Sequence, residues 1–142
     1  MSKAARSLAL VLLLLSTSVS AQEGNVITKE QLVEMFNGMA KDTKWDLSKP
    51  MLWGYFFTDG SKAKLEHAAP LLQKQGYHFV SIYLSDKEHP KDPDLWWLHV
   101  EKVEMHTPDS LDRRNKSLYQ FAKDQGLRSY DGMDVGPANA AH

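Results

Sequence analysis

The chain has 142 residues, no cysteine, and 17 basic against 18 acidic residues. This length suits one compact domain that can bury a core without disulfide bridges. The lack of cysteine excludes thiol catalysis and cysteine-bound zinc. The balanced charge gives no basic footprint for nucleic acid or for an anionic membrane surface. We therefore expect a single soluble domain.

The first 21 residues have the pattern of a secretory signal peptide. Lys3 and Arg6 precede the apolar run LALVLLLLSTSV, and the triplet Val19-Ser20-Ala21 fits the small-x-small cleavage pattern. The apolar run is short for a membrane span, and no cysteine follows it as a lipid attachment site. An uncleaved membrane anchor is the alternative interpretation.

Cleavage after Ala21 would make Gln22 the first residue of the mature protein. We then expect a periplasmic or secreted protein with no stable membrane insertion. Loss of Lys3 and Arg6 lowers the formal net charge from −1 to −3, because residues 1–21 contain no acidic residue. This charge argues against nucleic acid as a partner.

Residues 22–50 are expected to form an N-terminal helix and a linker. Thr28 and Gln31 make a capping-box pattern, so the helix should begin near Lys29. Pro50 should prevent any continuation of helix into the next segment. One apolar stripe recurs at helical spacing and should be buried; it consists of Leu32, Met35, Phe36 and Met39.

Residues 51–137 alternate between strand and helix patterns. The strands are MLWGYFFT, YHFVSIYL, LWWLHVEKVEMH and LRSYDGMDVG. One helix ends at Gly76, and a second begins after Thr107-Pro108 and ends at Gly126. This order predicts an α+β fold, a ferredoxin-like βαββαβ sandwich. Its four-stranded antiparallel sheet should carry two helices on one face, in addition to the N-terminal helix. Residues 138–142 are expected to be a disordered tail.

The first strand carries large side chains on both faces. Because side chains alternate along a strand, we expect Leu52 and Phe56 to face the helices and Trp53, Tyr55 and Phe57 to face the other way. An exposed aromatic patch of that kind marks a binding surface unless something covers it. The N-terminal helix is the cover that we expect, and a homodimer contact or a partner is the alternative.

Four blocks follow one another between Leu52 and Pro137: WGYFFTD, LEHAAPLLQKQGYHFVSIYL, WWLHVEKVEMHTPDSLDRRNKSLYQFAKDQG and YDGMDVGP. Together they resemble the family of the regulator of ribonuclease E activity B, the RraB domain. The resemblance implies a ferredoxin-like sandwich and a non-catalytic role, because the named member of that family binds ribonuclease E and inhibits RNA cleavage. That member is cytoplasmic and has an acidic tail, which this chain lacks. For a chain with an export signal we expect an extracytoplasmic protein partner.

Six residues form the candidate partner-binding surface: Trp53, Tyr55, Trp97, Tyr130, Asp131 and Gly132. The first three lie on the two strands predicted to be central, and the last three are suggested by the resemblance. The segment SYDGMDVGP has too few oxygen ligands for an EF-hand and lacks the lysine and glycines of a phosphate loop. We expect it to be a strand in which Gly132 permits a bulge.

The sequence predicts no catalytic, cofactor or metal site. The six histidines lack the spacings of a zinc site, and no serine lies in a nucleophile elbow. Glu101 and Glu104 should fall on opposite faces of a straight strand, so they do not form a carboxylate pair. The alternative function is binding of a small ligand or single-stranded nucleic acid on the sheet, because RNA-recognition folds of this topology place aromatics on the two central strands.

Overall fold

The computed structural model describes residues 11–12 and 26–142 of the chain. Its elements in chain order are β1 (Val11–Leu12), α1 (Lys29–Asp42), β2 (Met51–Asp59), α2 (Lys62–Lys74), β3 (His78–Leu84), β4 (Trp96–Glu104), α3 (Pro108–Asp124), β5 (Ser129–Gly136) and the 3₁₀ helix η3 (Ala138–Ala140). The strands form one sheet in the order β1-β5-β2-β4-β3, with every neighbouring pair antiparallel. The predicted α+β, ferredoxin-like βαββαβ arrangement is confirmed, with β2 and β4 at the centre of its four strands.

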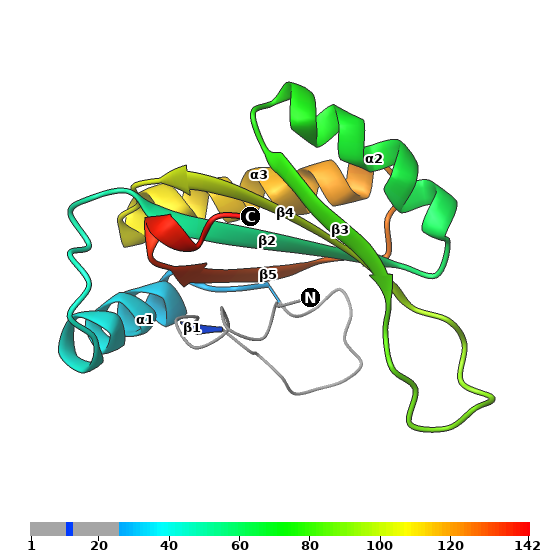
Figure 1. Cartoon of the computed structure of the whole chain (residues 1–142), viewed down its shortest axis with the longest axis horizontal. Helices are drawn as coiled ribbons and strands as arrows, with labels where there is room; N and C mark the ends of the chain where they lie inside the picture. Colours follow the sequence, from blue (N-terminus) through cyan, green and yellow to red (C-terminus); the bar gives the residue numbers. More distant parts are fainter. Residues whose placement is uncertain (1–10, 13–25) are drawn as a thin grey trace.

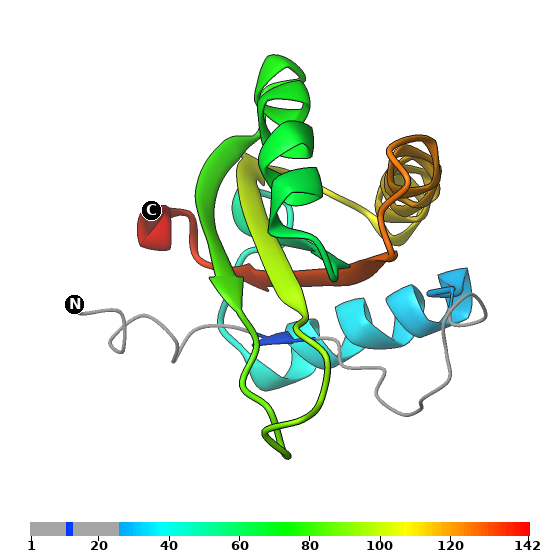
Figure 2. The ribbon, with the colours of Figure 1, turned by 90° about the vertical axis from the view of Figure 1, so that its right-hand side faces the viewer.

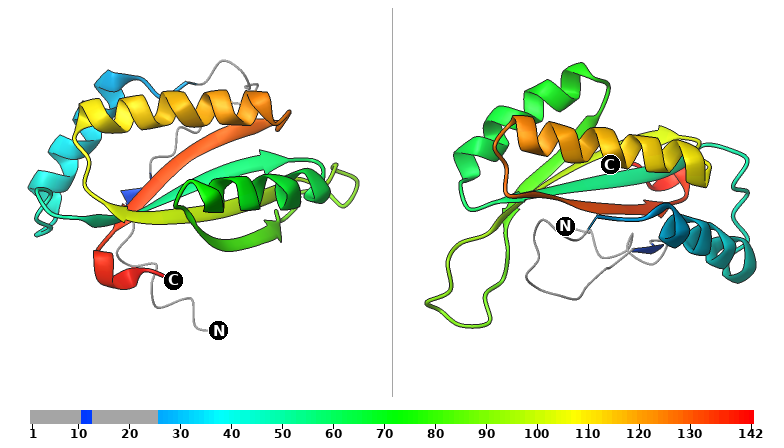
Figure 3. Two further views of the ribbon diagram at one scale, coloured as in Figure 1. Left: turned by 90° about the horizontal axis from the view of Figure 1, so that it is seen from above. Right: turned by 180° about the vertical axis from the view of Figure 1, so that it is seen from behind.

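In the described part of the chain, α2 and α3 cover one face of the sheet and no α-helix covers the other (Figures 1 and 2). We call the side against which α2 and α3 pack the helix face, and the opposite side the outer face. Figure 2 shows η3 on the outer side of the sheet, across from α3. Helix α1 lies beyond the β5 edge of the sheet and contacts α3 (Figure 3). The core therefore lies between the sheet and three helices.

The predicted helix ends are present and have the expected local chemistry. Thr28 and Gln31 make a complete capping box at the start of α1, and Thr107 caps α3 with Pro108 in its first turn. Gly76 and Gly126 follow the ends of α2 and α3 with φ of 96° and 67°, a conformation that glycine adopts without steric cost.

The predicted orientation of β2 is wrong. Trp53, Tyr55 and Phe57 face the helices and are almost completely buried. The Phe57 ring lies 5.7 Å from that of Phe121 on α3, and the Tyr55 hydroxyl reaches Arg114 on the same helix. The space between a sheet and its helices must be filled at close-packed density, and large rings fill it best. The set of alternating residues with the larger side chains therefore points inward. Leu52 and Phe56 belong to the opposite set and lie on the outer face.

The apolar stripe of α1 is buried, as the sequence predicts. The stripe meets Trp53, one of the aromatic residues that we expect it to cover, but Trp53 lies on the helix face and not on the opposite face. The Phe36 ring stacks on Trp53 with centroids 5.9 Å apart. The backbone N–H of Ile27, just before the helix, donates to the Tyr119 hydroxyl of α3 at 2.9 Å. Helix α1 therefore extends the helical layer past the edge of the sheet.

Two predictions concern the ends of the chain. The predicted cleavage site at Val19-Ser20-Ala21 lies outside the described residues, whereas Val11 and Leu12 of the apolar run pair with Val135 and Asp134 of β5. In residues 138–142, for which we expected disorder, the structure has the 3₁₀ helix η3. Among the helices in the described part of the chain, none has the length and apolar character needed to cross a membrane.

Candidate functional site

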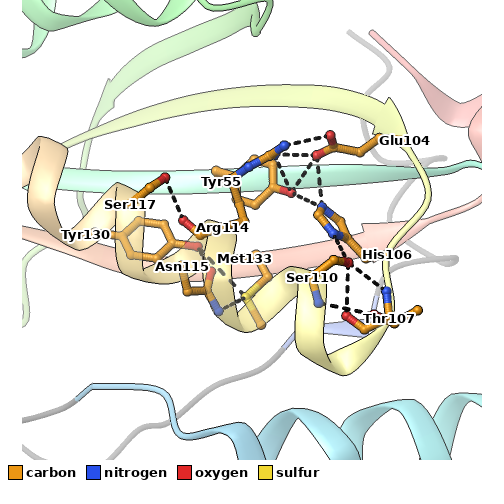
Figure 4. Close-up of polar contacts among 10 residues, drawn as sticks. All are labelled: Tyr55, Glu104, His106, Thr107, Ser110, Arg114, Asn115, Ser117, Tyr130 and Met133. Carbon is orange, nitrogen blue, oxygen red and sulfur yellow. Dashed lines mark hydrogen bonds and ion pairs between the residues drawn. The ribbon is translucent and has the colours of Figure 1, made fainter.

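A polar network on the helix face joins the end of β4 to α3 (Figure 4). The Arg114 guanidinium donates to both carboxylate oxygens of Glu104, from Nη1 to Oε2 at 2.5 Å and from Nη2 to Oε1 at 2.9 Å. The Tyr55 hydroxyl donates to the same Oε2 at 2.8 Å, and His106 Nε2 lies 3.1 Å from it. Three side chains, of Tyr55, His106 and Arg114, therefore contact the carboxylate of Glu104.

The network holds Glu104 in its charged form. Burial by itself would raise the pKa of this carboxyl group, but the hydrogen bonds of His106, Arg114 and Tyr55 outweigh burial. The pKa falls from its usual 4.5 to about 2. In turn, Glu104 contributes to raising the pKa of Arg114. The pair is a bidentate, partly buried ion pair, a geometry that fixes orientation as well as charge.

The same network contains a chain of serine, histidine and carboxylate. His106 Nδ1 lies 2.8 Å from Ser110 Oγ, and its other ring nitrogen contacts Glu104. A hydrolase relay links the same three groups, but with Nε2 towards the serine and Nδ1 towards the carboxylate. Here, however, the guanidinium of Arg114 binds the carboxylate, and Ser110 Oγ accepts the backbone N–H of Thr107 at 2.8 Å as part of the α3 capping box. These contacts have a structural purpose, which is to attach the start of α3 to the end of β4.

The outer face carries a second cluster, which lies on three neighbouring strands. Gly54 of β2 pairs with Glu101 of β4 on one side and with Asp134 of β5 on the other. Residues directly opposite each other in a sheet share a face, so both carboxylates flank the glycine on the outer face. A Cβ at position 54 would collide with Asp134 Oδ1 and lie 2.9 Å from His99 Nε2. We call this Glu101–Gly54–Asp134 arrangement the acidic recess.

Asp134 and the neighbouring His99 have shifted pKa values. Burial, followed by the charge of Glu101, raises the pKa of Asp134 from 3.8 to about 6. Burial lowers the pKa of the neighbouring His99 from 6.5 to about 4, so this ring is neutral at pH 7. The His99 ring also stacks on Phe56 with centroids 4.4 Å apart. The recess therefore combines carboxylates with an uncharged, flat wall.

Aromatic side chains continue the outer face beyond the recess. Tyr83 of β3 stacks on Trp97 of β4 with a centroid distance of 6.2 Å, and Trp97 meets Phe56 edge-on at 6.1 Å. Tyr83 is 42% exposed. On the same face Val103 is 50% exposed. Val103 lies six residues beyond Trp97 along β4, with His99 and Glu101 between them on the same face, so it is separate from the aromatic group. Tyr83, Trp97 and Phe56 form a partly exposed apolar surface on the side of the sheet that no α-helix of the described residues covers, and we call it the aromatic ridge.

The six residues predicted as a partner-binding surface do not come together. Trp53, Tyr55 and Tyr130 are core residues of the helix face, so they cannot contact a partner without unfolding. Trp97 is half-buried on the outer face, Asp131 is exposed and Gly132 is buried. The predicted bulge is confirmed, because the β2–β5 register skips Asp131 and Gly132 has a φ of 106°.

Sequence reasoning missed the acidic recess. It placed Glu101 and Glu104 on opposite faces, which the structure confirms, but it did not connect Glu101 with Asp134. The glycine at position 54, between two aromatic residues of a central strand, was the available signal, because such glycines mark close approach of other groups. Within residues 11–12 and 26–142, no group of three or more histidine and carboxylate side chains could hold a metal ion.

Comparison with known proteins gives one positive result. A search of curated proteins found no match to this chain. The profile of the family described as regulator of ribonuclease activity B, RraB, matches residues 29–135. This match runs from the first residue of α1 almost to the end of β5 and includes both polar clusters described above. It spans well over half of the sequence, and the chain therefore belongs to the RraB family of regulators of ribonuclease activity.

Proposed function

We propose that this chain is an exported, non-catalytic regulatory module of the RraB type that binds a protein partner through the outer face of its sheet. The observation that carries the proposal is the aromatic ridge. Tyr83 and Trp97 leave apolar surface open on the face that no α-helix of the described residues covers. Exposed apolar patches on a folded domain commonly mark contact surfaces. Family membership supports a regulatory role by protein binding.

The exposure of each residue in the structure revises the partner-binding surface that the sequence predicts. Trp97 stays in the proposed contact, and Tyr83 joins it. Trp53, Tyr55 and Tyr130 leave the set because they lie in the core. Asp131 lies on β5 at the bulge, where its carboxylate contacts Thr58 and Ser129. A partner that covers the ridge would reach β3 and β4 first.

Affinity capture from the compartment in which the mature protein resides tests this proposal. The wild-type chain should capture a protein that Tyr83→Ser captures at least about tenfold less well, because contact aromatics dominate interface energy. Val33→Ala is the matched control, since Val33 is also exposed (38%) but lies on α1. Equal capture by all three proteins would overturn the assignment of the ridge.

Export after cleavage at Ala21 is part of the proposal. The sequence pattern of residues 1–21, which is typical of a signal peptide, supports export. N-terminal sequencing of protein from the native host should return Gln22. A cytosolic protein that begins at Met1 or Ser2 would refute export and make a cytoplasmic ribonuclease a plausible target.

The proposed location also argues against ribonuclease E as the partner. An exported protein does not meet ribonuclease E. We therefore expect that equimolar mature protein does not slow RNA cleavage by ribonuclease E in vitro. Strong inhibition in that assay would mean that the chain acts directly on the ribonuclease.

Binding of single-stranded nucleic acid is the second candidate, because the stacked pair Tyr83 and Trp97 is partly exposed on the outer face. The carboxylates of Glu101 and Asp134 on that face oppose it, since they repel phosphates. A salt titration with a single-stranded oligonucleotide distinguishes the two candidates. Binding that weakens steeply with salt would favour nucleic acid.

A further inference from the structure

Glu101 is a buried carboxylate whose hydrogen bonds come from the segment after the sheet. It lies on central strand β4 and is 2% exposed. The backbone N–H of His142 donates to Oε2 at 2.7 Å, and the ring Nδ1 of the same residue lies 2.9 Å from Oε1. Within the described part of the chain, no other group hydrogen-bonds this carboxylate. A buried carboxylate without a partner is costly, so His142 satisfies a need that the sheet itself leaves open.

Asp134 has no such side-chain partner. It is 7% exposed, and its charged form is favoured by the backbone N–H groups of Gly54 and of Asp134 itself and by the charge of His142. Its Oδ1 lies directly over Gly54, in the space that a side chain would otherwise fill. Two carboxylates and two imidazoles, of His99 and His142, therefore meet at the acidic recess. One of its two carboxylates still lacks a donor side chain in the described structure.

The segment that carries His142 is weakly attached. The 3₁₀ helix η3 has no side-chain cap; its residues Ala138 and Asn139 are exposed, and so is Ala141, which follows it. Small, exposed side chains bury little apolar surface, so they contribute little to holding the segment in place. The two contacts of His142 with Glu101, and an edge contact of its ring with His99 at 5.7 Å, provide most of its specific attachment.

We propose that the acidic recess is a recognition subsite for an arginine side chain of the protein partner, and that His142 is an internal competitor which the partner displaces. Charge complementarity supports this occupant, since two buried carboxylates surround one recess. A guanidinium has five N–H donors in a planar fork, enough to serve Glu101 in the manner of His142 and also to reach Asp134. The wall formed by His99 and Phe56 suits a flat cation. This inference rests on the proposed function, because it names what the partner presents to the outer face.

Peptide titration of the full chain tests the subsite without the partner. The probe is acetyl-Ala-Ala-Arg-amide, and its control has citrulline in place of arginine, which keeps the shape but removes the charge. The readout is the amide resonance of Gly54, followed by ¹⁵N-correlated NMR. His142→Ala should bind the arginine peptide at least about fivefold more tightly than the wild type, because an internal competitor lowers apparent affinity by the fraction of open sites. The citrulline peptide should not bind.

The carboxylates identify the site of binding. Adding Glu101→Gln to His142→Ala should abolish binding, and adding Asp134→Asn should weaken it severalfold; the two substitutions are separate, so one result remains if the other variant does not fold. Glu88→Gln, an exposed carboxylate in the β3–β4 loop, is the matched control and should change nothing. Equal affinities of the wild type and His142→Ala, or binding by His142→Ala that neither carboxylate substitution weakens, would overturn the proposal.

The outcome is separable from that of the proposed function. If the arginine peptide binds near Gly54 but Tyr83→Ser captures the partner as well as the wild type does, the arginine subsite is supported and the aromatic ridge is refuted as the contact surface. Capture that depends on Tyr83, with no peptide binding by His142→Ala, would keep the protein-binding function and refute the subsite.

Discussion

Glu101 and Asp134 lie on opposite sides of Gly54 and are both paired with it, so two buried carboxylates share one row of the outer face. The absence of a side chain at Gly54 gives these groups their space. Their proximity also couples their charges, because the negative charge of Glu101 adds to burial in raising the pKa of Asp134 to about 6. The outer face is therefore under electrostatic strain at neutral pH.

The first prediction is that Asp134→Asn stabilises the protein at pH 7. The folded pKa of about 6 lies above the ordinary 3.8, so the unfolded state loses its proton first as the pH rises. Stability should fall between about pH 4 and pH 6, and the loss at pH 7 amounts to about 3 kcal/mol at most. Urea unfolding of both proteins from pH 3.5 to 7 measures the difference. The gain from Asn should vanish near pH 3.5, and a destabilised variant at pH 7 would contradict the pKa assignment.

The second prediction concerns Gly54 itself. Gly54→Ala should destabilise the protein by about 2 kcal/mol, because the new methyl group meets Asp134 and His99 on a sheet that cannot yield. Gly38→Ala is the matched control. Gly38 lies inside α1 with no atom within 4 Å of its Cβ position, so alanine there should stabilise by up to about 1 kcal/mol. Chemical denaturation measures the free energy of unfolding of both variants. We expect a decrease for Gly54→Ala and an increase for Gly38→Ala. Stabilisation by both would mean that position 54 has space to spare.

The element order, the helix caps and the bulge were predictable because each depends on local chemistry. Thr28 with Gln31, Thr107 with Pro108, and the glycine at position 132 act on neighbouring residues, so their sequence patterns suffice. The central position of β2 and β4 followed from the βαββαβ order.

The orientation of β2 was not predictable by alternation alone. Both sets of alternating residues contain large apolar side chains, so burial occurs on both faces and the alternation signal disappears. A comparison of the side-chain volumes of the two sets would have indicated the orientation. Trp53, Tyr55 and Phe57 are all large, whereas the other set contains Gly54. The acidic recess depends on the register of three strands far apart in sequence, which no local pattern determines.

The third prediction concerns the ion pair between Arg114 and Glu104. Arg114→Met should destabilise the protein by about 2 to 3 kcal/mol at pH 7, because it leaves a partly buried carboxylate without its guanidinium. Arg114→Lys should recover only part of this loss, since an ammonium cannot donate to both oxygens in a fixed fork. Arg113→Met, a change at an exposed neighbour, should lie within about 0.5 kcal/mol of the wild type. A comparable loss in both methionine variants would attribute the effect to helix α3 in general.

The fourth prediction is the pH dependence of the same network. Glu104 has a folded pKa of about 2, below its ordinary 4.5, so it contributes stability that is complete above about pH 4.5. That contribution should decrease as the pH falls from 4.5 towards 2. Urea unfolding of the wild type and Glu104→Gln over this range should give curves that converge at low pH. Curves that stay parallel would show that the carboxylate is not held by its hydrogen bonds.

The fifth prediction tests how α1 is attached. Phe36 stacks on Trp53 at the edge of the helix face, so Phe36→Ala should remove a buried ring and open one side of the indole. Substitutions of this kind in a core cost about 3 kcal/mol or more. Trp53 is 1% exposed in the intact protein, and its fluorescence should become accessible to acrylamide when α1 loosens. Val33→Ala, on the exposed side of the same helix, should leave both stability and quenching unchanged. If Phe36→Ala also left both unchanged, the core between the sheet, α2 and α3 would be complete without α1. The helix would then be an appendage, and its apolar stripe would need another explanation, such as contact with a partner.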